Sequence, residues 1–302
     1  MVNNTAEGVS IILVNFNTPD LTHHCIKSIF EFTKIPFEII VIDNHSTTHD
    51  PHQFKIDFPQ ISLIVNEQNL GFAKANNIGI KLSKFQHILL LNSDTFLKND
   101  AIDSAYSKYI SLENEGIKLG AMSIRLIYPD GRFQHTARNF RTSTKEILDL
   151  LRPLLYLVGY QKRSRLMMNQ YFNGDYSTFC DMVSGAFFLF NRNLLTLLPN
   201  QILDERYFMY GEDVLWSWQL KQLGFQNYFF HESEIIHINQ GSRKTKKKSP
   251  LKLTMIMKHE LDFYKLRFGA GFGFQIFKFI YLGKEFGRNI LLSLLKNLNF
   301  IK

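Results

Sequence analysis

The stretch Val9–Asn17 has the sequence VSIILVNFN, a continuous apolar run followed by polar residues. Continuous apolar runs rich in β-branched residues are typical of strands buried on both faces of a parallel sheet. Phe37–Ile42 and His87–Leu91 have the same character, and Asn or Asp follows each of them closely. Helical spacing over Asp20–Phe32 and Phe72–Leu82 separates these strands. Strands alternating with helices predict an α/β fold with a mostly parallel central sheet flanked by helices.

Polar side chains end three of the expected strands. In sheets of this kind, ligands bind at the carboxyl ends of the strands. An edge lined with Asn and Asp suits hydroxyls, a nucleobase edge or a cation, and it does not suit an apolar ligand. No GxGxxG follows the first strand and no GxxxxGK[ST] occurs, which disfavours a Rossmann dehydrogenase and a P-loop kinase. The strand-end residues are Asn15 and Asn17, Asp43 and Asn44, and Asn92, Ser93 and Asp94.

Two residues indicate a cation site. Asp94 follows an apolar strand, where a carboxylate can hold a divalent cation such as Mg²⁺ or Mn²⁺ and leave positions for substrate phosphates. His237 also ends a strand-like run and precedes Gly241, so it could ligate a metal or contact a phosphate. Each signal is weak alone, because strand-end Asp residues often lie in solvated turns and a lone His is more often structural.

The segment Asn69–Asn77 predicts a helix whose start faces a ligand. Gly71 permits a tight entry into the helix. The free N–H groups of the first turn would then point at an anion or a polar ligand. Asn76 lies one turn further, on the same side as Phe72. A plain loop-to-helix start is the simpler interpretation when this motif is taken alone.

Two adjacent acids, Glu212 and Asp213, begin an expected helix over Glu212–Leu223. Acids at a helix start are common because they interact favourably with the helix dipole. The functional hypothesis is that one acid is a general base while its neighbour binds the acceptor or holds a loop. Asp204 and Glu205 lie just upstream and are expected to add to an acidic pocket.

The second part of the chain has a different pattern. Tyr128–Gly131 is a strong turn signal, which predicts a hairpin between 123–127 and 132–136. Lys145–Phe172 predicts a helical excursion with a basic face, and Asp181–Phe190 and Asn227–Phe230 predict strands. We therefore expect a catalytic domain over residues 1–248, with a donor half of about 1–118 and an acceptor half of about 119–248, and a C-terminal helical tail over 249–302.

The tail and the charge suggest anionic partners. Phe263–Lys302 mixes large apolar residues with cations such as Lys278 and Lys284, which suits amphipathic helices at an anionic membrane; a helix packed on the catalytic domain is the alternative. The net charge is +8, and the densest basic run is Arg243–Lys248. Nucleic acid, anionic lipid and phosphorylated substrates are the candidate partners.

Location and redox state follow from simple features. No window of about 20 residues is free of charge, so no transmembrane helix is expected. Met1–Gly8 is polar and lacks an apolar signal core. We expect a cytoplasmic protein that associates peripherally with the inner face of the cell membrane. Cys25 and Cys180 lack metal-binding spacing and are expected to be reduced, buried thiols.

Together, these motifs resemble the inverting GT-A glycosyltransferases of family 2, especially the bacterial rhamnosyltransferase-like branch. They occur in the family's order between Val9 and Ser242, which is most of the chain. Several such motifs in order are a far more specific signal than any single one. The matching segments are Val14–Asn17, Val41–Ser46, Asn69–Asn76, Leu91–Thr95, Ser184–Ala186, Tyr210–Val214 and His237–Ser242.

The resemblance implies a GT-A fold, a UDP- or dTDP-sugar donor and inversion at the anomeric carbon. It implies Asp213 as the base, with Glu212 as the alternative, and Asp94 as a metal ligand. An inverting transfer needs a base on the acceptor hydroxyl and a cation on the departing diphosphate, which agrees with the motifs. The acceptor would be a glycan or a polyprenyl-diphosphate-linked saccharide in surface polysaccharide assembly. The donor-side residues are Asn15, Asn17, Asp43, Asn44, Asn69, Gly71, Asn76, Asn92 and Ser93, and the acceptor-side residues are Ser184 and Gly185.

The chain departs from the family pattern at two places. Asn92 stands where the first carboxylate of the D-x-D motif is found, so cation binding depends on Asp94 and His237. Leu215 and Gln219 stand where the family often has Asp and Arg, so donor specificity does not transfer.

Two other functions remain as alternatives. A nucleotidyltransferase would need a loop rich in Gly and Arg after the first strand, and Asn15–Asp20 has none. A non-catalytic lipid- or nucleic-acid-binding protein would not need Asp43, Asp94 and Asp213 together. Aromatic RNA-binding signatures are absent, so nucleic acid is not the expected partner.

Overall fold

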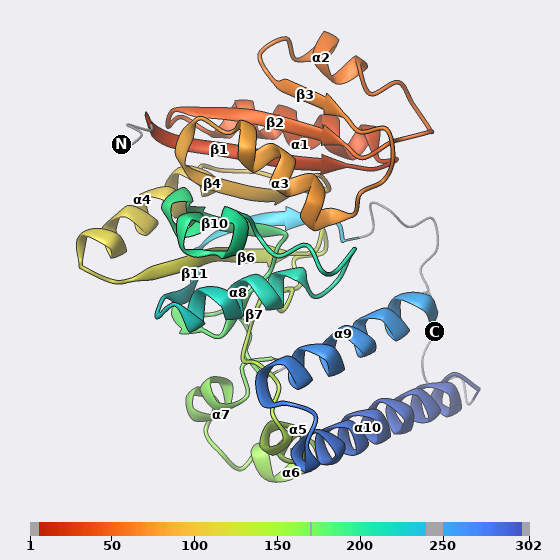
Figure 1. Cartoon of the computed structure of the whole chain (residues 1–302). Coiled ribbons are helices and arrows are strands. Elements are labelled where there is room, and N and C mark those ends of the chain that lie inside the picture. Colours follow the sequence, from red (N-terminus) through yellow and green to blue (C-terminus); the bar gives the residue numbers. More distant parts are fainter. Residues whose placement is uncertain (1–5, 170, 240–249, 298–302) are drawn as a thin grey trace.

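The computed structural model describes residues 6–169, 171–239 and 250–297. Its main sheet has the strand order β3-β2-β1-β4-β10-β6-β11-β5, and β8 also pairs with β11 (Figure 1). β10, β5 and β8 run antiparallel to their neighbours, and the other pairings are parallel. The strands are β1 (Ala6–Asn15), β2 (Phe37–Asp43), β3 (Ser62–Val65), β4 (Phe85–Asn92), β5 (Thr95–Phe96), β6 (Leu119–Ile127), β8 (Thr178–Cys180), β10 (Phe187–Asn191) and β11 (Gln226–His237).

Helices cover both faces of this sheet, so the predicted α/β architecture is confirmed (Figure 1). β1 shows why: Ile11 and Leu13 are buried on the face covered by α1 and α4, whereas Ile12 is buried on the face covered by α3 and α8. A strand buried on both faces must be apolar throughout, as this one is. The helices are α1 (Pro19–Phe32), α2 (Gln53–Asp57), α3 (Phe72–Leu82), α4 (Ala101–Asn114), α5 (Ser143–Leu150), α6 (Arg152–Leu155), α7 (Tyr160–Leu166), α8 (Glu212–Gln222), α9 (Pro250–Phe268) and α10 (Phe272–Asn297), with 3₁₀ turns η1 (Arg192–Leu197) and η2 (Pro199–Gln201).

The parallel register brings the strand ends to one edge of the sheet. Asn15 lies opposite Asp43 in the β1–β2 pair, and Val14 lies opposite Asn92 in the β1–β4 pair. The predicted polar edge is therefore present, and it borders the cleft described below.

The acceptor half differs from the prediction in detail. The turn at Tyr128–Gly131 forms, with the Gly131 N–H donating to the Tyr128 carbonyl at 2.9 Å. However, the second arm joins the first through a single bridge, Ile127 to Phe133, and then turns into β7 (Ala137–Arg138). The expected strand Asp181–Phe190 is likewise interrupted at Ser184–Ala186. Its first part, β9 (Met182–Val183), pairs with β7 in a separate small sheet, while β10 joins the main sheet.

The C-terminal helices pack on the helical excursion, and α5, α6, α7, α9 and α10 together form a helical lobe (Figure 1). The ring of Phe277 on α10 stacks on Tyr264 of α9, with centroids 3.8 Å apart. Lys284, expected to face a membrane, instead pairs with Glu146 and with Asp149 of α5, the latter at 2.8 Å. In the described part of the chain, no helix is long and apolar enough to cross a membrane. Cys25 and Cys180 are buried and unpaired, as predicted.

Candidate active site

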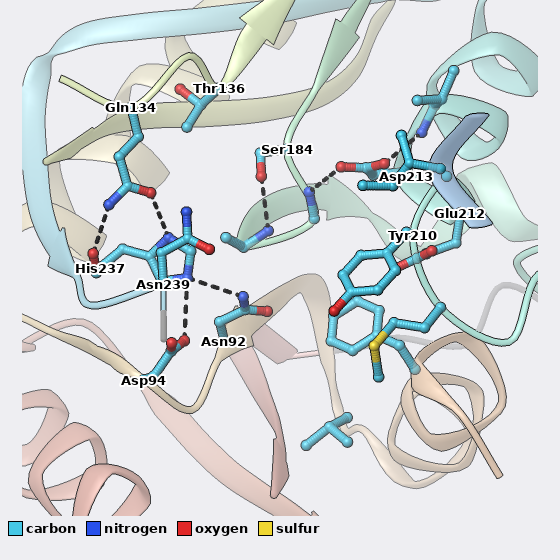
Figure 2. Close-up of a pocket in the computed structure, with 18 of the residues that line it drawn as sticks. Asn92, Asp94, Gln134, Thr136, Ser184, Tyr210, Glu212, Asp213, His237 and Asn239 are labelled. Atoms are coloured by element: carbon cyan, nitrogen blue, oxygen red, sulfur yellow. Dashed lines mark hydrogen bonds and ion pairs between the residues drawn. The ribbon is translucent and has the colours of Figure 1, made fainter. Parts of the chain in front are cut away.

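A cleft of about 610 Å³ lies between the carboxyl edge of the sheet, the start of α8 and one face of α9. It brings together the predicted metal, acceptor-side and catalytic residues, which come from four separate segments (Figure 2). Predicted residues in its lining are Asn44, Asn69, Asn92, Ser93, Asp94, Ser184, Gly185, Glu212, Asp213 and His237. Asn15, Asn17, Asp43, Gly71 and Asn76 are not part of the lining.

Asp43 and Asn15 contact each other beneath the cleft. Asp43 is fully buried and accepts hydrogen bonds from Asn15 Nδ2 at 2.6 Å, Ser46 N at 2.8 Å and Ser46 Oγ at 2.7 Å. Asn15 Oδ1 accepts from the hydroxyls of Thr18 and Thr22. The Asp43 carboxylate is therefore hydrogen-bonded to protein donors in this structure. It fixes the loop after β2, and its direct contact with a nucleobase stays a prediction.

The remaining donor-side residues shape loops beside this edge. Asn17 Oδ1 accepts from the Thr47 and Thr48 N–H groups, and Asn76 Nδ2 donates to the Phe72 carbonyl at 2.9 Å. Asn44 Nδ2 donates to Asn69 Oδ1 at 2.7 Å, which holds the two loops together.

Gly71 is required by geometry. Its φ is +81°, and a Cβ there would lie 2.4 Å from the Phe208 carbonyl oxygen. The Phe72 N–H donates to that same carbonyl, at 2.9 Å. The start of α3 is therefore bonded to the loop that precedes the acid pair, and the Phe72 N–H is not available to a ligand.

Asp94 and His237 form the predicted pair. His237 Nε2 lies 3.1 Å from Asp94 Oδ1 and 3.2 Å from Asn92 Nδ2 (Figure 2). Gln134 Nε2 donates to the His237 carbonyl at 2.6 Å, so Gln134 Oε1, 2.8 Å from His237 Nδ1, accepts the Nδ1 proton. In the neutral ring, Nε2 then presents its lone pair toward the Asp94 carboxylate. Two acceptors at this distance require a proton or a cation between them.

This donor set fits a divalent cation. A ligating His usually donates its other ring N–H to a carbonyl or carboxylate, as His237 does to Gln134. Across the described residues, no group of three or more His, Cys, Asp or Glu side chains is placed to hold a metal. The other oxygen ligands would therefore come from water, from neutral protein groups or from a substrate, a pattern that Mg²⁺ sites often show.

The acid pair lies on the opposite side of the cleft, at the first turn of α8. Asp213 is partly buried; its Oδ2 accepts from the Gly185 N–H at 3.2 Å and its Oδ1 from the Val214 N–H at 2.9 Å (Figure 2). Glu212 is only 8% exposed, and its Oε2 is buried without a hydrogen-bond partner. Burial and the neighbouring Asp213 raise the pKa of Glu212 to about 8. Glu212 is therefore mainly protonated at pH 7, whereas Asp213 accepts hydrogen bonds from two backbone N–H groups.

The expected contribution of Asp204 and Glu205 to this pocket is wrong. Asp204 pairs with Arg206 at 2.7 Å and accepts from Gln219 at 3.3 Å, and Glu205 accepts from Asn77 at 2.8 Å. Both side chains lie outside the cleft lining because these partners hold them against the loop and α3.

Several lining residues were missed. Gln134, His135, Thr136 and Arg138 follow the turn and line the cleft, and the run of polar side chains in this segment was a usable signal. The α9 residues Ile256, His259, Glu260 and Phe263 also line the cleft, and no motif marks them. His259 contacts the Tyr210 carbonyl through Nδ1 and stacks on Tyr207, with ring centroids 4.1 Å apart. The basic run Arg243–Lys248 lies outside the described residues.

Comparisons with known proteins identify similar chains. The chain is 27% identical over 230 residues to the poly-beta-1,6-N-acetyl-D-glucosamine synthase of Staphylococcus aureus, covering 73% of this chain and 47% of the relative. It is 26% identical over 106 residues to glycosyltransferase GlyG of Streptococcus pneumoniae, covering 34% of this chain and 35% of that relative. The chain thus spans less than half of the length of these relatives.

Solved structures share the fold. The mannosyltransferase PcManGT of Pyrobaculum calidifontis, in complex with GDP-Man and Mn²⁺, matches with a TM-score of 0.58 and 13% identity, covering 100% of this chain and 79% of that one. S. aureus TarS residues 1–349, in complex with UDP, match with a TM-score of 0.52 and 15% identity, covering 84% and 64%. The central sheet and its flanking helices therefore form a GT-A fold. Residues 10–192, more than half of the chain, match the model of glycosyl transferase family 2, and this chain belongs to that family.

Proposed function

We propose that this chain is an inverting glycosyltransferase that moves a sugar from a nucleoside-diphosphate sugar to a glycan or a lipid-linked saccharide during surface polysaccharide assembly. The observation that carries the proposal is the cleft with Asp213 on one side and the Asp94–His237 pair on the other. Inversion needs a base at the acceptor hydroxyl and charge stabilisation at the leaving diphosphate, from opposite sides of the sugar. The name of the staphylococcal synthase, which is a polysaccharide synthase, supports the acceptor class.

Asp213 would accept the proton of the acceptor hydroxyl. The Gly185 N–H fixes one carboxylate oxygen at the first turn of α8. Glu212, kept protonated by burial, adds no second negative charge beside the base. Only one of the two acids is thus prepared to take a proton at neutral pH.

Asp94 and His237 would hold a divalent cation, Mg²⁺ or Mn²⁺, which when bound supplies positive charge to the diphosphate of the donor. Gln134 keeps the His237 proton on Nδ1, so Nε2 faces the cation position. Solved structures with UDP and with GDP-Man and Mn²⁺ support a nucleotide-sugar donor and a cation. We propose UDP- or dTDP-sugars as the donor class.

We also propose peripheral association with an anionic membrane. Phe272, Ile276, Phe279 and Phe286 are spaced to share one face of α10, and all four are exposed; Phe272 and Phe279 are 82% and 81% exposed. Lys278, between them in sequence, is exposed as well. An apolar stripe with adjacent cations suits the interface of an anionic bilayer.

A donor screen tests the function. The purified chain, with Mn²⁺, would be mixed with UDP-, dTDP- and GDP-sugars, and slow release of nucleoside diphosphate and thermal shift would be measured. At least one donor is expected to be hydrolysed slowly and to stabilise the protein. If no nucleotide sugar does either, the glycosyltransferase proposal fails for this chain.

The cation assignment has its own test within the same assay. Asp94→Ala is expected to abolish both turnover and metal-dependent stabilisation, whereas the control Asp100→Ala, an exposed acid at the start of α4, leaves both unchanged. Full wild-type activity in excess chelator would overturn the metal site and leave the base assignment standing.

A further inference from the structure

Arg138 lies at a defined place along the cleft. Gln134, Thr136 and Arg138 all line the cleft, and Gln134 contacts His237 at the end proposed for the diphosphate. The Thr136 carbonyl accepts from the Ser184 N–H at 2.8 Å, next to Gly185, which binds Asp213. Arg138 is two residues further, paired with Met182 in the β7–β9 ladder. At about 3.3 Å per strand residue, its backbone lies about 7 Å beyond the level of the base. That distance is roughly one sugar ring away from the reacting hydroxyl.

The guanidinium of Arg138 has no partner among the described residues. The side chain is partly buried and makes no hydrogen bond or ion pair in the described part of the chain, and its Nε is buried without an acceptor. The other partly buried arginines of the described residues all have a partner. Arg125 pairs with Glu234, Arg141 with Glu146 and Glu260, Arg163 donates to Val158 O, Arg192 to Ser83, and Arg267 to Arg141 O. Desolvating a donor without a partner is costly, so a ligand group at Arg138 is expected.

Nearby carboxylates do not neutralise this charge. Glu260 lines the same cavities, but its carboxylate pairs with Arg141 at 3.4 Å. Glu212 is mainly protonated at neutral pH, and Asp213 is engaged by the Gly185 and Val214 amides. Arg138 therefore adds a positive charge to the acceptor side of the cleft that these protein groups leave unpaired.

A side cavity of mixed character follows Arg138. It has a volume of about 120 Å³ and shares His135, Arg138, Val214, Glu260 and Phe263 with the main cleft. Phe140, Met182, Val214 and Phe263 form one buried apolar cluster on one side of it, and its polar lining includes Asn139, Arg141 and Asn169. A ligand that extends past the base thus meets Arg138 first and the edge of this apolar cluster next.

We propose that Arg138 binds a phosphate group of the acceptor, and that the acceptor is a sugar joined through phosphate or diphosphate to a lipid. Guanidinium binds phosphate with paired, charge-assisted hydrogen bonds, and the order of hydroxyl, anion and apolar chain along the ligand matches the order of Asp213, Arg138 and the apolar cluster. This proposal rests on the proposed glycosyltransferase function, and it names the acceptor class for the same cleft.

The first test measures binding without turnover. Undecyl diphosphate, inorganic pyrophosphate and undecyl maltoside would be titrated calorimetrically into the full chain in chelator, so that no cation recruits a diphosphate to Asp94 and His237. Arg138→Gln is expected to weaken undecyl diphosphate binding about 10- to 100-fold. Arg138→Lys should lie between, because it keeps the charge and loses the planar fork. Arg165→Gln, an exposed arginine of α7, is the matched control and should bind as the wild type.

Comparing these compounds distinguishes a lipid-linked phosphate from a free one. Undecyl diphosphate bound more tightly than pyrophosphate, with both sensitive to Arg138→Gln, supports a lipid-linked acceptor. Equal affinity for the two would overturn the lipid part of the proposal. Equal affinity of wild type and Arg138→Gln for undecyl diphosphate would overturn the site itself.

The second test measures transfer. Using an active donor, an alkyl-diphospho-sugar acceptor would be compared with the matching alkyl glycoside that lacks the diphosphate. Arg138→Gln should raise KM for the first acceptor about 10-fold or more and leave the second acceptor and donor hydrolysis unchanged. Loss of donor hydrolysis in this variant would indicate a structural role and overturn the proposal. If the wild type never transfers a sugar, yet binds undecyl diphosphate through Arg138, the proposed glycosyltransferase function would be wrong and the phosphate site would stand.

Discussion

Two adjacent carboxylates occupy opposite environments at the start of α8. Tyr210 and Gly211 both have positive φ, +67° and +111°, and after this turn both acids line the cleft, with Glu212 buried and Asp213 partly buried. Glu212 lacks a partner for Oε2, whereas Asp213 accepts two backbone N–H groups. Burial raises the pKa of Glu212, and a carboxyl group that keeps its proton cannot act as a base. Here the arrangement favours Asp213 as the proton acceptor.

We predict that Asp213→Asn lowers transfer by about 10²- to 10⁴-fold, because an amide cannot take the acceptor proton. Donor affinity should stay close to that of the wild type, since the Asp94–His237 pair lies on the other side of the cleft. Transfer rates and donor binding by calorimetry check this. Near wild-type turnover in this variant would exclude Asp213 as the base.

Glu212→Gln should separate the two acids by the pH dependence of stability. The folded-state pKa of Glu212, about 8, lies above its ordinary value of 4.5. Between these pH values unfolding releases a proton, so the Glu212 contribution to wild-type stability falls as pH rises. Because Gln is neutral throughout, the Tm of the variant relative to wild type should rise steadily from pH 5 to pH 8.

Thermal melts across this pH range give the measurement, and Glu67→Gln, an exposed acid, is the control with no such trend. A Tm difference that does not change with pH would show that Glu212 is ionised in the folded protein. Activity of Glu212→Gln at pH 7 should remain within about tenfold of wild type if Asp213 is the base.

At the scale of elements, sequence patterns predicted those helices and strands whose ends depend on residues close by in the sequence. The helix over Phe72–Leu82 has the predicted bounds, since Gly71 marks its start and its apolar spacing is regular. The strand ends that carry Asn15, Asp43 and Asn92 were predicted to meet because parallel strands share an edge. These inferences need only the spacing of apolar residues along the chain and the register of neighbouring parallel strands.

Other features of the site depend on contacts between distant segments, which no local pattern records. The approach of His259 to Tyr210, across 49 positions, is one example. The strand expected over Asp181–Phe190 breaks because Ser184 N donates to the Thr136 carbonyl and Gly185 N to Asp213. The hydrogen bonds from Ser46 to Asp43 are another example, because they depend on how the loop after β2 folds back.

We predict that α9, through His259, positions the turn at Tyr210 and Gly211 that precedes Asp213. Nδ1 of His259 contacts the Tyr210 carbonyl, and its ring stacks on Tyr207, so it supports a turn with unfavourable backbone angles. His259→Ala should lower kcat about 10- to 100-fold by displacing Asp213, with little change in donor affinity. His259→Asn, whose amide can donate to the same carbonyl, should recover part of the loss.

Steady-state kinetics with separate kcat and KM values test this role, and the neighbouring exposed Lys258→Ala serves as the control. An unchanged kcat in His259→Ala would contradict it. An equal loss of kcat in His259→Asn and His259→Ala would also contradict it, because the loss of ring stacking alone would then explain the lower kcat.

At the scale of the whole molecule, the helical lobe has a packed side and an exposed apolar side. On α10, Phe277 and Tyr281 are buried against α9, and Lys284 pairs with acids of α5, so removing α10 would uncover Tyr264 and leave those acids without their cation. Truncation would therefore confuse folding with membrane binding. Substitutions confined to the exposed stripe avoid that problem.

We predict that the double variant Phe272→Ser, Phe279→Ser loses affinity for anionic vesicles while its fold is unchanged. Both side chains are more than 80% exposed, so the free energy of unfolding should change little. Burying a Phe in the interface contributes about 1.5–3 kcal/mol, so two together should account for a loss of at least about 100-fold. Lys278→Gln should remove only a salt-sensitive part, about 1 kcal/mol.

Sedimentation with neutral and anionic vesicles at low and high salt measures both effects, and Ile56→Ser, an exposed apolar residue of α2, is the matched control. Wild-type binding should weaken with salt without vanishing, because burial of apolar surface is not screened as charge is. If the double variant sediments like the wild type while its circular dichroism is unchanged, the stripe on α10 does not contact the membrane. The exposed leucines Leu154 and Leu157, in and just after α6, would then be the next surface to substitute.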